Sequence, residues 1–324
     1  MMHAKALRGV RPVPRGDWAM KGCADMRQAP DTERDTGCPG DAWFMEVVQK
    51  PPHPPPFRFA LFDFDGTVSL IREGWQDVMI PYFTEVLGAA PLAEDRLALT
   101  EEVTGFVDRL TGKQTIFQCI RLDEEVRKRG GPPVAPGEYK AEYLRRLAKH
   151  IENRVTALKE GADPEEYLVP GCRTLFALLQ ERGYQLHLAS GTDEEDVLRE
   201  AALLGIADWF HGRIRGARDH VTDCSKERVI RDIIRGNRLT GKELLAFGDG
   251  FVEIELAAGF GGYAVGVASD ERRRRGVDPR KRGRLLEAGA HMIIPDFAGA
   301  KALIHYIETG ECHESVCGGD FTGA

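Results

Sequence analysis

Short apolar runs alternate with stretches of helical periodicity along the second half of the chain. The apolar runs predict strands over residues 57–63, 184–189, 209–214, 244–247, 263–267 and 291–294. Between and after them, apolar residues recur at helical spacing over residues 171–182, 193–204, 226–235, 251–258, 279–288 and 298–308. This alternation predicts an α/β fold with right-handed crossovers and a Rossmann-like parallel sheet covered by helices on both faces.

The pattern is different between residues 71 and 167, where helical periodicity continues without a strand. It predicts helices over residues 74–87, 92–110, 113–129 and 138–160. Because a structureless connection of this length is improbable, we expect an all-α cap domain, residues 71–167, inserted into a core formed by residues 57–70 and 168–309.

The two ends of the chain have little periodicity. Residues 1–56 are rich in Gly, Pro and Arg and end in a proline run from Pro51 to Pro56, which predicts a poorly ordered extension with a semi-rigid linker. Residues 42–48 are the apolar exception and could dock on the body. The polar, glycine-rich residues 310–324 predict a flexible tail.

Composition narrows the class of protein. The chain of 324 residues has 42% hydrophobic and 29% charged residues and a net charge of −7, which is typical of a globular protein and disfavours general nucleic-acid binding. Seven scattered cysteines favour reduced thiols and a cytoplasmic location. No apolar stretch approaches the ~18 residues of a membrane span. Oligomeric state is left open.

One basic run, Arg272–Arg275, contrasts with the negative net charge. We interpret it as a solvated loop or, because it follows a strand at the expected catalytic end of the sheet, as a site that recruits an anionic substrate.

The candidate catalytic and metal-binding residues follow the predicted strands. Asp63 and Asp65 follow the first strand, Ser190 follows the second, and Asp249 with Glu253 follows the fourth. Lys226 begins a helix. In open α/β sheets such positions meet at one edge. Acids that converge there repel one another unless they bind a cation, and their oxygen ligands predict Mg²⁺. A metal with a lysine and a hydroxyl suits a phosphoryl group.

In this order, Asp63-Phe64-Asp65-Gly66-Thr67, Ser190, Lys226 and Gly248-Asp249-Gly250 with Glu253 resemble the four signatures of the haloacid dehalogenase-like (HAD) phosphatase superfamily. The inserted helices are similar to the helical cap of phosphoglycolate phosphatase and β-phosphoglucomutase-like members. The resemblance implies a Mg²⁺-dependent phosphatase that acts on a small phosphorylated metabolite such as a sugar phosphate.

The resemblance also implies roles for single residues. Asp63 would be the nucleophile that forms an aspartyl-phosphate, and Asp65 the general acid and base. Ser190 would bind the phosphoryl oxygens, and the next two residues, Gly191 and Thr192, would also bind the substrate. Lys226 would neutralise the negative charge of the nucleophile and the phosphate. Asp63, Asp65 through its carbonyl, Asp249 and Glu253 would hold the metal.

Several alternatives stay open from sequence alone. Lys242 is a second candidate for the lysine. In the cap, Thr111, Lys113 and Gln114 are candidates for substrate contact, by analogy with capped relatives. A phosphomutase of the same fold and a non-catalytic binding module are the rival functions.

Overall fold

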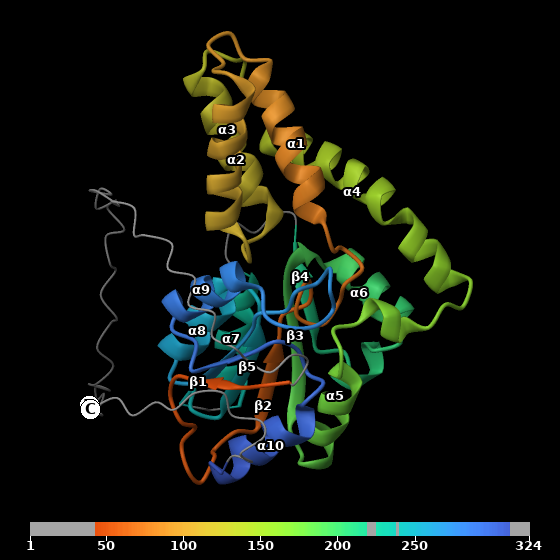
Figure 1. Ribbon diagram of the computed structural model, residues 1–324, viewed down its shortest axis with the longest axis vertical. Coiled ribbons are helices and arrows are strands. Elements are labelled where there is room, and N and C mark those ends of the chain that lie inside the picture. The colour runs from red at the N-terminus through yellow and green to blue at the C-terminus, as the bar shows by residue number, and fades with distance from the viewer. Residues whose placement is uncertain (1–42, 219–224, 238–239, 312–324) are drawn as a thin grey trace, which may run out of the picture. The chain divides into compact units, whose positions relative to one another are not determined.

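The computed structural model describes residues 43–218, 225–237 and 240–311, with a seven-stranded sheet in the order β1-β7-β6-β5-β2-β3-β4 (Figure 1). The strands are β1 (Glu46–Val47), β2 (Phe59–Phe62), β3 (Gln185–Asp193), β4 (Ile214–Ala217), β5 (Leu244–Gly248), β6 (Tyr263–Val267) and β7 (Met292–Ile294). Strands β2 to β7 pair in parallel. The predicted α/β fold is therefore confirmed.

Helices cover both faces of this sheet, as the alternating pattern predicts (Figure 1). The core helices are α5 (Cys172–Glu181), α6 (Glu194–Leu203), α7 (Ser225–Gly236), α8 (Phe251–Gly259), α9 (Pro279–Glu287) and α10 (Ala300–Thr309). Phe62 and Phe247 stack at 4.8 Å on the face covered by α5, α6 and α10. Leu61 and Ala246 face α7, α8 and α9. Central strands buried on both faces have continuous apolar sequences for this reason.

Segment 43–48 differs from the predicted extension, because β1 adds to the edge of the sheet. It pairs antiparallel with β7, so the sheet is mixed rather than wholly parallel. The Trp43 indole Nε1 donates to the carbonyl of Asp296 at 2.9 Å, and Glu46 forms an ion pair with Arg282. The strand is only two residues long, which is too short for a periodic signal, and it lies in the apolar stretch that could dock on the body. Residues 1–42 of the predicted extension lie outside the described residues, as do residues 312–324 of the tail.

Met45 provides a test of whether this segment belongs to the core. Its side chain is 1% exposed, so Met45→Ala is expected to lower the free energy of unfolding by about 2–4 kcal/mol through lost burial and a cavity. Urea unfolding of both proteins measures the change. The control is Val48→Ala three residues away, where the side chain is 55% exposed. Equal stability of the two variants would contradict a structural role for β1.

The insertion between β2 and β3 consists of four helices and a short 3₁₀ helix. They are α1 (Trp75–Gly88), α2 (Arg96–Leu110), α3 (Thr115–Lys128), α4 (Pro136–Lys159) and η1 (Pro164–Tyr167). Phe83 and Phe106 stack at 6.0 Å between α1 and α2, and Leu122 and Tyr143 add α3 and α4 to the same core. We call these elements the helical segment. Its predicted division as a separate domain over residues 71–167 stays a prediction.

The predicted position of the strand over residues 209–214 is wrong. Residues Ala207–Phe210 form a 3₁₀ helix, η2, and the strand is β4. His211 and Gly212 both have positive φ, which turns the chain sharply before the strand begins. A short apolar run fits either element by periodicity, and its length does not discriminate between them.

Among the helices of the described residues, none is long and apolar enough to cross a membrane.

Candidate active site

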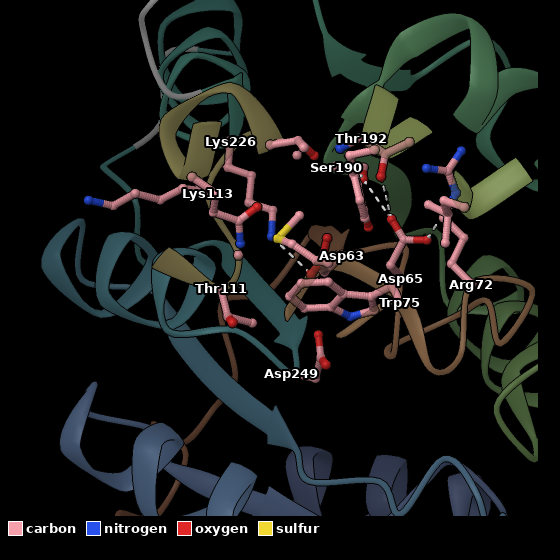
Figure 2. A pocket seen from close by; sticks show the side chains of 17 residues that line it. Asp63, Asp65, Arg72, Trp75, Thr111, Lys113, Ser190, Thr192, Lys226 and Asp249 are labelled. Carbon is pink, nitrogen blue, oxygen red and sulfur yellow. Dashed lines mark hydrogen bonds and ion pairs between the residues drawn. The ribbon is translucent and has the colours of Figure 1, made fainter. Parts of the chain in front are cut away.

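The strand-end residues meet around one cavity, between the sheet and the helical segment (Figure 2). Strands β3, β2 and β5 are neighbours in the sheet, so their carboxyl ends present Ser190, Asp65 and Asp249 side by side. Asp63 and Asp65 both line the cavity, whereas Phe64 between them is fully buried in the core. The one-residue spacing of the two carboxylates thus directs both to the same space.

Lys226 lies between two buried carboxylates at the bottom of the site. Its Nζ lies 2.9 Å from Oδ2 of Asp63 and 2.7 Å from Oε2 of Glu253, and its side chain is 2% exposed. The other oxygen of Glu253 accepts from the backbone N–H of Gly250 at 2.8 Å. Both oxygens of Glu253 are therefore engaged in positioning Lys226 and the start of α8. The alternative Lys242 is exposed and precedes β5.

Burial and neighbouring charges of opposite sign shift the pKa values of this group in opposite directions. Burial raises the pKa of Asp63 well above its usual value; Lys226 opposes this shift, and the carboxylates of Glu253 and Asp249 add to it. Burial likewise raises the pKa of Glu253. Lys226 has a raised pKa because the two carboxylates outweigh its desolvation. One lysine is thus insufficient to neutralise the acids around it.

Asp65 is oriented by hydroxyl groups and an arginine. Its Oδ2 accepts from Oγ1 of Thr192 at 2.7 Å and from Oγ of Ser190 at 3.4 Å. Its Oδ1 is buried without a hydrogen bond among the described residues, and Nε of Arg72 lies 3.8 Å from it. Arg72 is itself held by the fully buried Glu200, at 2.7 Å. The carboxylate is therefore fixed on one side and faces the cavity on the other.

Asp249 completes the group from β5. Oγ1 of Thr67 donates to Asp249 Oδ1 at 3.3 Å and accepts from the Asp249 backbone N–H at 2.9 Å. Lys281 lies 2.9 Å from Oδ2. Gly66, at φ 76°, lets the turn after β2 approach, because a Cβ there would lie 2.3 Å from Asp249 Oδ2. The glycine of the first motif is thus required by contact as well as by conformation.

The donor set fits a hard divalent cation. Carboxylate oxygens of Asp63, Asp249 and Glu253 lie within 4.8 Å of one another, and Mg²⁺ prefers oxygen ligands of this kind. Burial is the main cause of the raised pKa of Asp63, and a divalent cation would offset the negative charges of Glu253 and Asp249 that add to it. Asp63 and Asp249 would hold it, with the backbone carbonyl of Asp65, while Glu253 already has two partners.

The helical segment forms the wall of the cavity opposite the sheet. Of the three predicted contact residues, two line this wall and one does not. Thr111 lines the cavity, but its hydroxyl donates to the Val107 carbonyl at 3.0 Å. Lys113 also lines the cavity but is exposed, and in Figure 2 its side chain extends away from Asp63. Gln114 is buried and is not among the described lining residues.

The same loop touches the core through its backbone. A Cβ on Gly191 would lie 2.7 Å from the carbonyl oxygen of Lys113. Gly191 therefore serves close approach between β3 and the loop before α3.

The arginine run has intramolecular partners. Arg272 pairs with Asp77 on α1, and Arg274 donates to the carbonyls of Glu165 and Leu168. These contacts join the loop after β6 to α1, the first helix of the helical segment, and to η1 and Leu168 at its end. They leave the hypothesis of substrate recruitment without support from these two arginines.

Sequence reasoning missed Arg72 and Lys281. Arg72 follows the first motif in a stretch without helical or strand periodicity, and a charge so close to the motif was the available signal. Lys281 lies within the basic stretch Arg280–Arg282, where nothing distinguishes it from its neighbours.

A sheet whose strands β2 to β7 are parallel, with a polar cavity at the strand ends, is typical of α/β enzymes. Residues 57–261, more than half of the chain, match the family model of the haloacid dehalogenase-like hydrolases. The chain belongs to this family and is a hydrolase, which confirms the predicted membership. No curated protein matches the chain.

Solved structures share the fold at low identity. A predicted phosphoglycolate phosphatase from Haemophilus somnus aligns with TM-score 0.52 and 16% identity over 77% of this chain and 98% of its own. A predicted phosphatase from Clostridium acetobutylicum gives 0.50 and 14%, over 77% and 99%. A haloacid dehalogenase-like protein of unknown function from Agrobacterium tumefaciens gives 0.50 and 16%, over 78% and 99%. These similarities establish the fold.

Proposed function

We propose that the protein is a Mg²⁺-dependent phosphatase that hydrolyses a small phosphorylated metabolite through an aspartyl-phosphate, in the cytoplasm. The observation that carries the proposal is the arrangement of Asp63 and Asp65 on one cavity, with Lys226 2.9 Å from Asp63. Mg²⁺, when bound, would neutralise the charge of the phosphoryl group.

In the first step, an oxygen of Asp63 attacks phosphorus and the bond between phosphorus and the leaving oxygen breaks. Asp65 gives its proton to that oxygen, so the alcohol departs neutral. Lys226 neutralises charge beside Asp63, and the hydroxyl of Ser190, which lies at the cavity, binds a phosphoryl oxygen.

In the second step, the carboxylate of Asp65 takes a proton from water. The resulting hydroxide attacks phosphorus, the bond from phosphorus to Asp63 breaks, and phosphate leaves. Thr192 supports both steps by holding Asp65 at 2.7 Å. The proton that Asp65 lost in the first step is thereby restored.

A phosphomutase would use the same residues but return the phosphoryl group to a sugar. Release of inorganic phosphate without a bisphosphate activator separates the two reactions. The non-catalytic alternative is disfavoured by the hydrolase family and by the complete polar set around the cavity.

The test is hydrolysis of p-nitrophenyl phosphate by the purified protein. We expect turnover with Mg²⁺, loss of turnover after chelation with EDTA, and recovery when Mg²⁺ is added back. Calcium serves as the control ion, since it tolerates a larger and less regular oxygen shell than Mg²⁺. Undiminished turnover in EDTA, or no phosphate release from any ester of a phosphometabolite panel, would contradict the proposal.

A further inference from the structure

Two neutral polar side chains of the helical segment line the catalytic cavity without a partner. Gln118 on α3 is 3% exposed and Tyr143 on α4 is 3% exposed. No side-chain hydrogen bond of either residue is found within the described residues. The buried polar atoms that lack a partner among the described residues do not include those of Gln118 or Tyr143, so these atoms are open to the cavity, where a bound molecule can hydrogen-bond them.

Their position is on the leaving-group side of the site. Both side chains line the cavity that Asp65 also lines, and both belong to the helical segment. Asp65 must reach the leaving oxygen to protonate it. Groups beside Asp65 on the helical segment therefore face the part of the substrate beyond that oxygen.

The charges of the described lining residues argue against an anionic leaving group. The cations among them are Arg72, Lys113 and Lys226. Arg72 is paired with Glu200 and Asp196, and Lys226 with Asp63 and Glu253. Lys113 is exposed, with Nζ 5.9 Å above the ring of Phe251. A second anion would thus enter a site rich in carboxylates with no buried, unengaged cation from these residues.

The cavity is also small and partly apolar. Its volume is ≈ 90 Å³, well below the roughly 300–1,000 Å³ of typical ligand pockets. Trp75, Met79 and Leu147 contribute apolar wall from α1 and α4. Such a space suits a short carbon chain better than an extended ligand.

We propose that Gln118 and Tyr143 are specificity-determining residues that hydrogen-bond the hydroxyl groups of a compact, uncharged leaving group. The substrate class is then the monophosphate ester of a small polyol or sugar, rather than a phosphate ester that also bears a carboxylate. This inference rests on the proposed phosphatase function.

The first test uses the wild-type protein with Mg²⁺ and three esters. They are glycerol 1-phosphate, which has an uncharged polyol, phosphoglycolate, which has a carboxylate, and p-nitrophenyl phosphate as a general phosphatase substrate. We expect kcat/KM for glycerol 1-phosphate to exceed that for phosphoglycolate by about ten-fold or more. The reverse order would overturn the inference while leaving the phosphatase proposal intact, whereas no hydrolysis of any of the three would overturn both.

The second test changes the two side chains. Gln118→Leu and Tyr143→Phe are each expected to lower kcat/KM for glycerol 1-phosphate by about ten-fold, with a smaller loss for p-nitrophenyl phosphate, which offers no hydroxyl. Gln118→Lys places a cation in the wall and should shift the ratio of the two metabolite esters toward phosphoglycolate.

The matched control is Tyr82→Phe on α1, which removes the hydroxyl of a buried tyrosine outside the described cavity lining. Its kinetics should equal those of the wild type. Unchanged ester ratios in all the Gln118 and Tyr143 variants would overturn the inference. If a variant fails to fold, as thermal unfolding would reveal, the wild-type order of esters decides.

Discussion

Asp63→Asn is expected to lower turnover by a factor of roughly 10⁴ to 10⁶, the usual range for loss of a covalent nucleophile. The amide retains the shape of the side chain but cannot attack phosphorus. The fold should survive, because burial already raises the pKa of Asp63 and a neutral group costs less to bury there. Initial rates with p-nitrophenyl phosphate and a thermal unfolding curve measure both effects.

Trapping the covalent phosphoryl-enzyme distinguishes a nucleophile from a residue that only binds the substrate. Wild-type protein quenched in acid during turnover of a ³²P-labelled ester should carry label, and Asp63→Asn should carry none. Asp63→Glu tests position, since it keeps the carboxylate but moves it by one methylene, and it should also be inactive. Asp208→Asn, at an exposed position on η2, is the control and should behave as the wild type. Labelled Asp63→Asn protein would assign the nucleophile elsewhere.

The strands of the core could be predicted well because each depends on the pattern of a few neighbouring residues. Phe59–Phe62 forms a buried strand that ends one residue before Asp63, as its apolar run indicates. The site residues at strand ends follow from topology, since the ends of neighbouring parallel strands must meet. The sequence therefore indicates which carboxylates share a cavity before any coordinates are known.

Contacts between distant residues have no such local signal. Lys281 reaches Asp249, and Arg72 is fixed by Glu200 on α6, more than a hundred residues away. The strand β1 reaches the sheet edge across an even longer separation, to β7. In the helical segment, helix positions were predictable from periodicity, but which side chains face the cavity depends on how the helices rotate and pack. For that reason the wall residues Gln118 and Tyr143 were missed, whereas Gln114 was expected at the cavity and is not among its described lining residues.

Lys226→Met is expected to remove activity and also to destabilise the protein. The lysine is 2% exposed and lies between two buried carboxylates. Without it, Asp63 and Glu253 face each other in a desolvated site, and loss of one partner from a buried ion pair typically costs about 3–5 kcal/mol. Urea unfolding at pH 8 in metal-free buffer measures this loss, and initial rates with Mg²⁺ measure the loss of charge neutralisation.

The pH dependence of that loss has a definite sign. Burial raises the folded-state pKa of Asp63 and Glu253 above the unfolded values, so the folded protein binds more protons and its stability falls as pH rises. Removing the lysine takes away the interaction that opposes these shifts. The stability deficit of Lys226→Met relative to wild type should therefore be larger at pH 8 than at pH 5.5.

A double variant separates stability from catalysis. Lys226→Met with Glu253→Gln removes one of the two repelling charges and keeps an oxygen that can accept from Gly250 N–H, as Glu253 does at 2.8 Å. It should regain part of the lost free energy of unfolding while remaining inactive, because no cation is restored beside Asp63. Wild-type stability and turnover in Lys226→Met at pH 8 would exclude the lysine from both roles.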